Sequence, residues 1–85
     1  MPACFMRSDA VLLADILESA DHIAEFIAAL DFEQFRDSEL VRSAVAQKFA
    51  LIGEVAGRLS ESFRSRHAAI PWPQIVALRN VLVRA

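Results

Sequence analysis

Residues 3–52 contain neither glycine nor proline, and this uninterrupted stretch constrains the fold more than any other feature. Apolar residues recur in its first half at intervals of three and four: Leu13, Ile16, Ala20, Ile23, Ile27 and Leu30. This spacing predicts a helix that buries one face, with Ser8 or Asp9 as its N-cap. Four further apolar residues widen the face: Val11, Leu12, Leu17 and Phe26. A face this broad suits a helical bundle better than a two-stranded coiled coil.

The segment DFEQFRDSE, residues 31–39, interrupts this pattern and is expected to connect two helices. Phe32 and Phe35 are expected to fold the connection onto the core. A second helix is predicted from about Glu39 to Leu59, capped by Asp37 or Ser38. Its apolar residues are again spaced by four and three: Val45, Phe49, Ile52, Ala56, Leu59 and Phe63.

A stripe of small residues runs along one side of the predicted second helix: Ala46, Ala50, Gly53 and Gly57. A glycine inside a helix costs about 0.5–1 kcal/mol relative to alanine. Two such residues therefore indicate a close crossing of helix backbones. The crossing can lie within the chain or between two copies of it.

Ser60 is expected to cap a short helix, and the Pro-Trp-Pro sequence at residues 71–73 separates it from a third helix. Pro73 fits the first turn of that helix, where a missing N–H costs nothing. Trp72 is expected to anchor the turn in the core or an interface. The fold class predicted is all-α: an antiparallel bundle of two long helices, a short helix and a third helix, with no strand.

The chain has 85 residues, enough for one small domain, expected to span residues 1–85. Hydrophobic residues make up 55% of it, above the usual value of about 45–50%. We therefore expect part of the apolar surface to be buried against a second chain, in a homodimer or higher homo-oligomer.

Composition also limits location and cofactors. Cys4 has no partner for a disulfide, which favours a reducing cytoplasm. No metal site or cofactor is expected, since one cysteine and two distant histidines, His22 and His67, lack ligand spacing. No membrane span is expected either, because acidic residues interrupt the best apolar run.

Charge is distributed unevenly along the chain. Residues 1–61 carry eleven acidic and five basic side chains, whereas residues 62–85 carry four arginines and no acid. A basic end on an acidic body suits a phosphate-bearing ligand. Chance, together with the preference of cations for helix C-termini, explains the same asymmetry.

Arg79 and Asn80 stand among apolar neighbours in the predicted third helix. On the residues alone they can be a solvated pair on a free helix face. However, three blocks and their spacing resemble the HepT-like branch of the HEPN superfamily: LLADILESADHIAEFIAALDFEQF, ALIGEVAGRLS and RHAAIPWPQIVALRN. These are ribonuclease-type toxins encoded beside a minimal nucleotidyltransferase (MNT) antitoxin. The resemblance covers residues 12–84.

The resemblance implies a helical bundle that dimerises and cleaves RNA, without metal, in a cleft between two protomers. Arg79 matches the motif arginine, which would hold the scissile phosphate, and Asn80 matches its polar helper. The motif histidine, the general acid or base, is expected five positions after Arg79, where this sequence has Arg84. An arginine cannot accept a proton near neutrality, so RNA binding without efficient turnover is expected.

The motif tyrosine is absent too, because the chain contains no tyrosine. The family's final helix is also missing, so the sequence is expected to be a family member cut short just past its motif. Arg64 and Arg66 are expected to extend an RNA-binding surface, with solvated helix-end charge as the alternative, and Glu54 to pair with an arginine in the cleft. His67 is a weaker candidate for a phosphate site, and His22 is expected at the surface. The alternative function is a non-catalytic helical module that dimerises or binds the nucleotidyltransferase.

Overall fold

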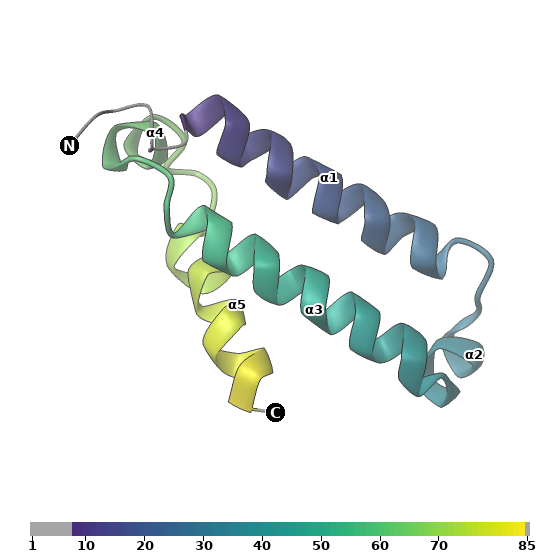
Figure 1. The fold of residues 1–85 in the computed structure, drawn as a ribbon. Helices are drawn as coiled ribbons and strands as arrows, with labels where there is room; N and C mark the ends of the chain where they lie inside the picture. The colour runs from purple at the N-terminus through teal and green to yellow at the C-terminus, as the bar shows by residue number, and fades with distance from the viewer. Residues whose placement is uncertain (1–7, 85) are drawn as a thin grey trace.

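The computed structural model describes residues 8–84, and the side chains of residues 8–82. This part of the chain forms five helices and no strand, as the sequence predicts: α1 (Asp9–Ile27), α2 (Phe32–Asp37), α3 (Glu39–Ala56), α4 (Glu61–Arg66) and α5 (Trp72–Arg84). Figure 1 shows α1 and α3 as long antiparallel helices, with α2 at one end and α4 at the other. α3 is the central helix, because α1 packs along it and α5 crosses it on another side.

Short polar side chains start four of the helices. Ser8, Ser38 and Ser60 each accept a hydrogen bond from a backbone N–H of the first turn of α1, α3 and α4. These three caps confirm the sequence prediction and identify Ser8 and Ser38 as the caps among the alternatives. An N-cap of this kind contributes about 1 kcal/mol.

The helix α2 lies where the sequence analysis predicted only a connection. Asp31 caps it, with its carboxylate accepting from Gln34 N at 2.8 Å. Gln34 Oε1 in return accepts from the backbone N–H of Asp31 at 3.0 Å. This reciprocal capping box is readable in the sequence, and it makes one and a half turns of helix favourable inside the turn.

The end of α3 also differs from the prediction, since the helix stops at Ala56 rather than Leu59. The next residues continue in a tighter turn, in which the N–H groups of Arg58 and Leu59 bond to carbonyls three residues back. Such a turn keeps Leu59 on the apolar face. The apolar spacing therefore persists beyond the helix.

The core lies where α1, α3 and α5 come together near α4. Its buried members are Leu12, Val55, Ala56, Leu59 and Trp72, with Ile16, Phe63, Ile75 and Val76 packed against them. Trp72 is thus a core anchor, as predicted: its indole N–H donates to the carbonyl of His67 at 3.1 Å. Its ring also meets the Phe63 ring edge to face.

The predicted buried face of α1 needs correction. Leu12 and Ser19 are its buried residues, whereas Ala20 and Ile27 are exposed. The true face is turned toward Leu12, because the core that α1 meets is formed by α3, Leu59 and Trp72 at one end of the molecule. Phe32 was expected on the core but is 74% exposed at the first position of α2, and of the two phenylalanines only Phe35 is partly covered.

Candidate nucleic-acid interface

Gly53 sets the distance between α3 and α5. A Cβ atom on Gly53 would lie 2.8 Å from the carbonyl oxygen of Ile75 and 3.0 Å from the backbone nitrogen of Arg79. Atoms at such distances overlap, so only glycine permits this approach. The small-residue stripe therefore serves a helix crossing within the chain, which was one of the two predicted roles.

Beside this crossing lies an open groove of about 470 Å³ between the two helices. Its lining residues are Gly53, Glu54, Gly57, Arg58, Val76, Arg79 and Asn80. Arg79 and Asn80 are exposed on α5 and line the groove from one side; Glu54 lines it from α3 and Arg58 from the turn that follows α3. Arg79 and Glu54 also line a smaller recess that reaches Gln47 and Leu51, so both border two depressions.

Of the charged side chains in this groove, two form an ion pair with each other and one has no partner among the described residues. Arg58 forms an ion pair with Glu54 at 3.6 Å, one helical turn apart and largely in solvent. An exposed pair of this kind contributes about 0–1 kcal/mol and leaves both groups available. Arg79 forms no ion pair or hydrogen bond with another residue in the described range 8–84. A guanidinium without a partner beside an open groove suits an anionic ligand.

Glu54 was a candidate to pair with an arginine in a cleft between protomers; within the single chain it pairs with Arg58, in the turn after α3. Arg58 is a lining residue of the groove that the sequence did not lead us to predict. Its signals are present in the sequence: it follows Gly57 in the small-residue stripe and stands four residues after Glu54.

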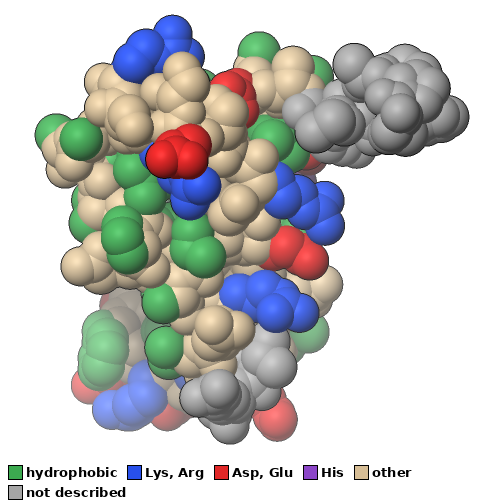
Figure 2. Space-filling view, turned by 90° about the vertical axis from the view of Figure 1, so that its left-hand side faces the viewer, with side chains coloured by type: hydrophobic (Ala, Val, Ile, Leu, Met, Phe, Trp, Pro, Cys, Tyr) green, Lys and Arg blue, Asp and Glu red, His purple; other side chains and the backbone are tan. Residues whose placement is uncertain are grey.

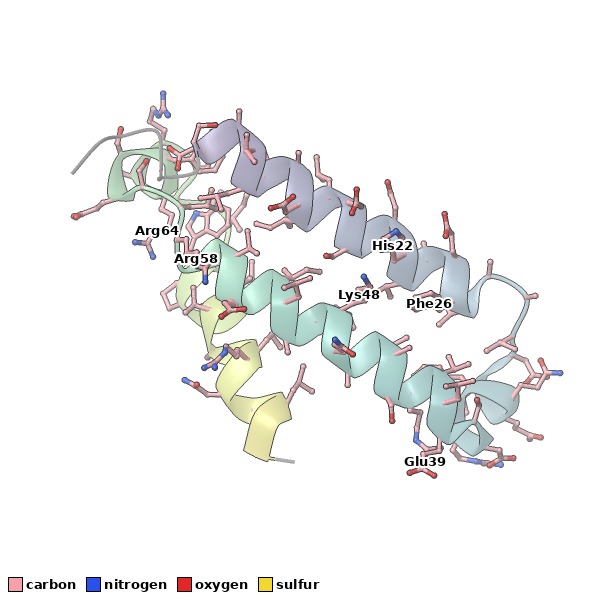
Figure 3. The ribbon with its side chains drawn as sticks, viewed as in Figure 1. His22, Phe26, Glu39, Lys48, Arg58 and Arg64 are labelled. Carbon is pink, nitrogen blue, oxygen red and sulfur yellow. The ribbon has the colours of Figure 1, made fainter. Side chains whose placement is uncertain are left out.

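Arg64 and Arg66 lie on α4, and the structure does not bring them into the Arg79 groove. The Arg66 guanidinium stands 6.0 Å from the Phe63 ring centroid. Arg64 is half-buried in a separate recess near Trp72. Figure 3 shows Arg58 and Arg64 on the same side of the molecule, near the junction of α3 and α4.

The remaining predicted site residues lie elsewhere. Arg84 is the last residue of α5, and its side chain lies outside the described ones. His67 is exposed and its ring tilts against Phe63 at 4.6 Å between centroids, outside the groove. His22 is half-buried rather than fully at the surface, because its ring stacks with Phe26 on the same helix.

In the range 8–84 no group of three or more His, Cys, Asp or Glu side chains is placed to hold a metal ion. No helix in the same range combines the length and apolar character that crossing a membrane requires.

Comparisons with known proteins agree with the resemblance seen in the sequence. A protein of Methanocaldococcus jannaschii named "Putative RNase MJ1380" is 35% identical over 77 residues, which cover 91% of this chain and 71% of that protein. A Thermococcus cleftensis protein named "Probable ribonuclease HepT" is 32% identical over 79 residues, covering 93% and 72%. No solved structure matches the chain. The family model described as "Ribonuclease HepT-like" matches residues 16–85, and the chain therefore belongs to the HepT-like ribonuclease family of the HEPN superfamily.

Proposed function

We propose that this protein is the RNA-directed component of a type II toxin–antitoxin pair, and that it takes up RNA in the α3–α5 groove. The observation that supports this most directly is the position of Arg79 and Asn80. Both are exposed side by side on α5, facing a groove, and the guanidinium has no partner among the described residues. Membership of the HepT-like ribonuclease family gives the class of ligand.

In this proposal Arg79 holds the scissile phosphate. Its planar fork of donors fits two phosphate oxygens at once. Asn80 is the next residue and carries both a donor and an acceptor, so it can hold a 2′-hydroxyl or a phosphate oxygen. Arg58 supplies a second guanidinium on the opposite wall, where it is paired with Glu54.

Arg84 occupies the position of the motif histidine, and we propose that this weakens catalysis. The guanidinium stays protonated near neutral pH, so it stabilises phosphate charge but accepts no proton. General acid–base catalysis contributes about 10²- to 10⁴-fold to a rate. We therefore expect this chain to bind RNA but to cleave it inefficiently.

A second copy of the chain would complete the site as a homodimer cleft in the cytoplasm, with a minimal nucleotidyltransferase as antitoxin. Val81 supports a partner against α5, because this apolar side chain is 62% exposed on that helix. An aliphatic side chain exposed this far gains about 1.5–3 kcal/mol when it is fully covered.

The test is single-turnover RNA cleavage by the unaltered chain and by Arg84→His, with Arg79→Ala as the control. We expect Arg84→His to raise the cleavage rate by roughly 10- to 1,000-fold, within the range of acid–base catalysis. Arg79→Ala should weaken RNA binding and reduce its dependence on salt. Equal cleavage rates for the unaltered chain and Arg84→His would remove the argument about the missing histidine.

The alternative function is a non-catalytic helical module that dimerises or binds the nucleotidyltransferase. An apolar recess of about 350 Å³ at the α2 end favours it, lined by Ile23, Ile27, Leu30, Asp31, Phe32, Phe35, Val45 and Phe49. If no RNA binds at low salt while the nucleotidyltransferase co-purifies with the chain, this alternative replaces the first proposal.

A further inference from the structure

A second recess lies near the candidate site, on the outer side of α4 and the start of α5. It measures about 380 Å³ and is lined by Glu61, Arg64, Ser65, Ala68, Ile70, Trp72 and Pro73. Its walls are mainly apolar, with three polar side chains from α4 among them. This mixture of flat apolar surface and a few donors and acceptors is what a nucleobase requires.

The apolar wall is held rigidly. The Trp72 indole N–H donates to His67 O, and the ring contacts Phe63 at 6.1 Å between centroids. Because both contacts fix the ring, Trp72 and the adjoining Pro73 form a preformed surface. Ile70, which is 41% exposed, borders the same recess.

The polar side chains of the recess can recognise a base edge. Arg64 is half-buried and forms no ion pair or hydrogen bond with another residue in the range 8–84. Its guanidinium plane can stack on a base or bond to the acceptors of guanine. Glu61 accepts hydrogen bonds, and the hydroxyl of Ser65 both donates and accepts.

This recess and the Arg79 groove follow one face of α5. Pro73 lines the recess, whereas Val76 and Asn80 line the groove, and residues spaced by three and four share a helix face. The other wall of both depressions comes from one stretch of chain, because Arg58 lies in the turn that leads from α3 to Glu61, the first residue of α4. Pro73 and Asn80 are separated along the axis by about 10 Å, at about 1.5 Å per residue.

That separation corresponds to about three stacked nucleotides at about 3.4 Å each, and to fewer in an extended strand. Figure 2 shows this side of the molecule: Lys and Arg side chains are spread over it, with acidic and hydrophobic side chains between them. Residues 62–85 contain no acidic residue, whereas Glu54 lines the groove and Glu61 lines the recess. A strand held at Arg79 would therefore meet the Arg64 guanidinium in the recess as it runs toward α4, beside the carboxylate of Glu61.

We propose that the recess between α4 and the start of α5 is a nucleobase subsite, which binds a base one to three nucleotides from the phosphate held at Arg79. The subsite rests on the proposed function, because it takes the same RNA strand. Base stacking against the exposed Pro73 ring or the Arg64 guanidinium plane, over the buried Trp72, contributes binding that a phosphate contact alone does not.

The experiment measures binding of the full chain to a fluorescent single-stranded 9-nucleotide RNA and to a set of the same RNA with one abasic ribose moved along it. Removal of the base keeps every phosphate, so it separates base contacts from charge. We expect one position at which the abasic RNA binds roughly 5- to 100-fold more weakly. Ser65→Trp, which fills the recess without changing charge, should weaken the intact RNA similarly and abolish the positional effect.

Ser43→Trp is the matched control, because Ser43 is an exposed serine on α3 far along the chain from the recess. It should bind all RNAs as the unaltered chain does, and circular dichroism should show both tryptophan variants folded. Two results would overturn the subsite alone, provided that RNA binding still depends on Arg79. One is an abasic series in which every position binds equally well, and the other is unchanged RNA binding by Ser65→Trp. Absence of any RNA binding overturns the proposed function together with it.

Discussion

The two ends of the α1–α3 hairpin are packed differently, although both have apolar sequences. At the α4 end, α5 and the turn after α3 close over the hairpin and bury Leu12, Leu59 and Trp72. At the α2 end, only one and a half turns of helix cover it, and Phe32 and Leu40 are 74% and 80% exposed. A third long helix, rather than apolar composition, decides where a core forms.

This difference extends to the shape of the chain. Its radius of gyration is 14.7 Å, whereas a compact domain of this length has about 12 Å. The candidate site lies at the packed end, where Gly53 brings α3 and α5 together. The open end has an apolar recess but no unpaired arginine lining it. The packed α4 end therefore combines a fixed helix crossing with the unpaired Arg79, whereas the α2 end has apolar surface that no helix covers.

The largest expected effect contrasts leucines at the two ends. Leu59→Ala should reduce the free energy of unfolding by about 2–5 kcal/mol, because Leu59 is only 2% exposed and its loss leaves a cavity. Leu40→Ala should change it by at most about 0.5 kcal/mol. Urea denaturation of both variants measures the difference. Equal losses would mean that the α2 end is buried in solution, against a second copy or partner.

The next effect concerns the helix crossing. Gly53→Ala should destabilise the fold by about 1–3 kcal/mol, because its Cβ would overlap backbone atoms of Ile75 and Arg79 and force the helices apart. RNA binding should weaken with it, since the backbone of Arg79 moves. Thermal melting and RNA titration of the same variant measure the two effects.

Gly57→Ala is the matched control. The backbone of Gly57 has an ordinary helical conformation, and its added Cβ would make normal contact with Val76 at 3.5 Å. This variant should be more stable than the parent by about 0.4–1 kcal/mol. If both glycine variants behave alike, the close crossing at Gly53 is not present in solution.

The smallest effect tests a contact that joins α1 to α4. Hydrogen bonds from the hydroxyl and then from the backbone N–H of Ser60 lower the pKa of Asp9 below its ordinary value. Because the folded pKa is depressed, the stabilisation is present above the unfolded pKa of about 3.9 and is lost as pH falls through the folded value. Melting temperature should therefore fall less between about pH 5 and pH 2 in Asp9→Asn than in the parent.

Asp21→Asn, an exposed position on the same helix, removes the same charge and should keep the acid sensitivity of the parent. Ser60→Ala should reduce the sensitivity as Asp9→Asn does, and should also lose about 1 kcal/mol from the α4 cap. Acid sensitivity unchanged in both Asp9→Asn and Ser60→Ala would show that this contact does not stabilise the fold.

Local sequence signals located most of the secondary structure. The serines at 8, 38 and 60 mark helix starts, and Pro73 lies in the first turn of α5, as predicted. The capping box between Asp31 and Gln34 also lay in the sequence, but the short α2 was missed because six residues show no apolar period. The family resemblance selected Arg79 and Asn80, and the structure places both at one groove.

The sequence by itself determined that this chain forms helices, where they begin, and that glycine is needed for a close crossing. These properties follow from interactions within a few residues. Tertiary structure alone decided that the crossing joins α3 to α5, that Arg58 and Arg79 line one groove, and that Ile27 and Phe32 stay uncovered. The reason is physical: helical period shows which residues share a face, but burial of that face depends on which helix the chain's turns bring against it.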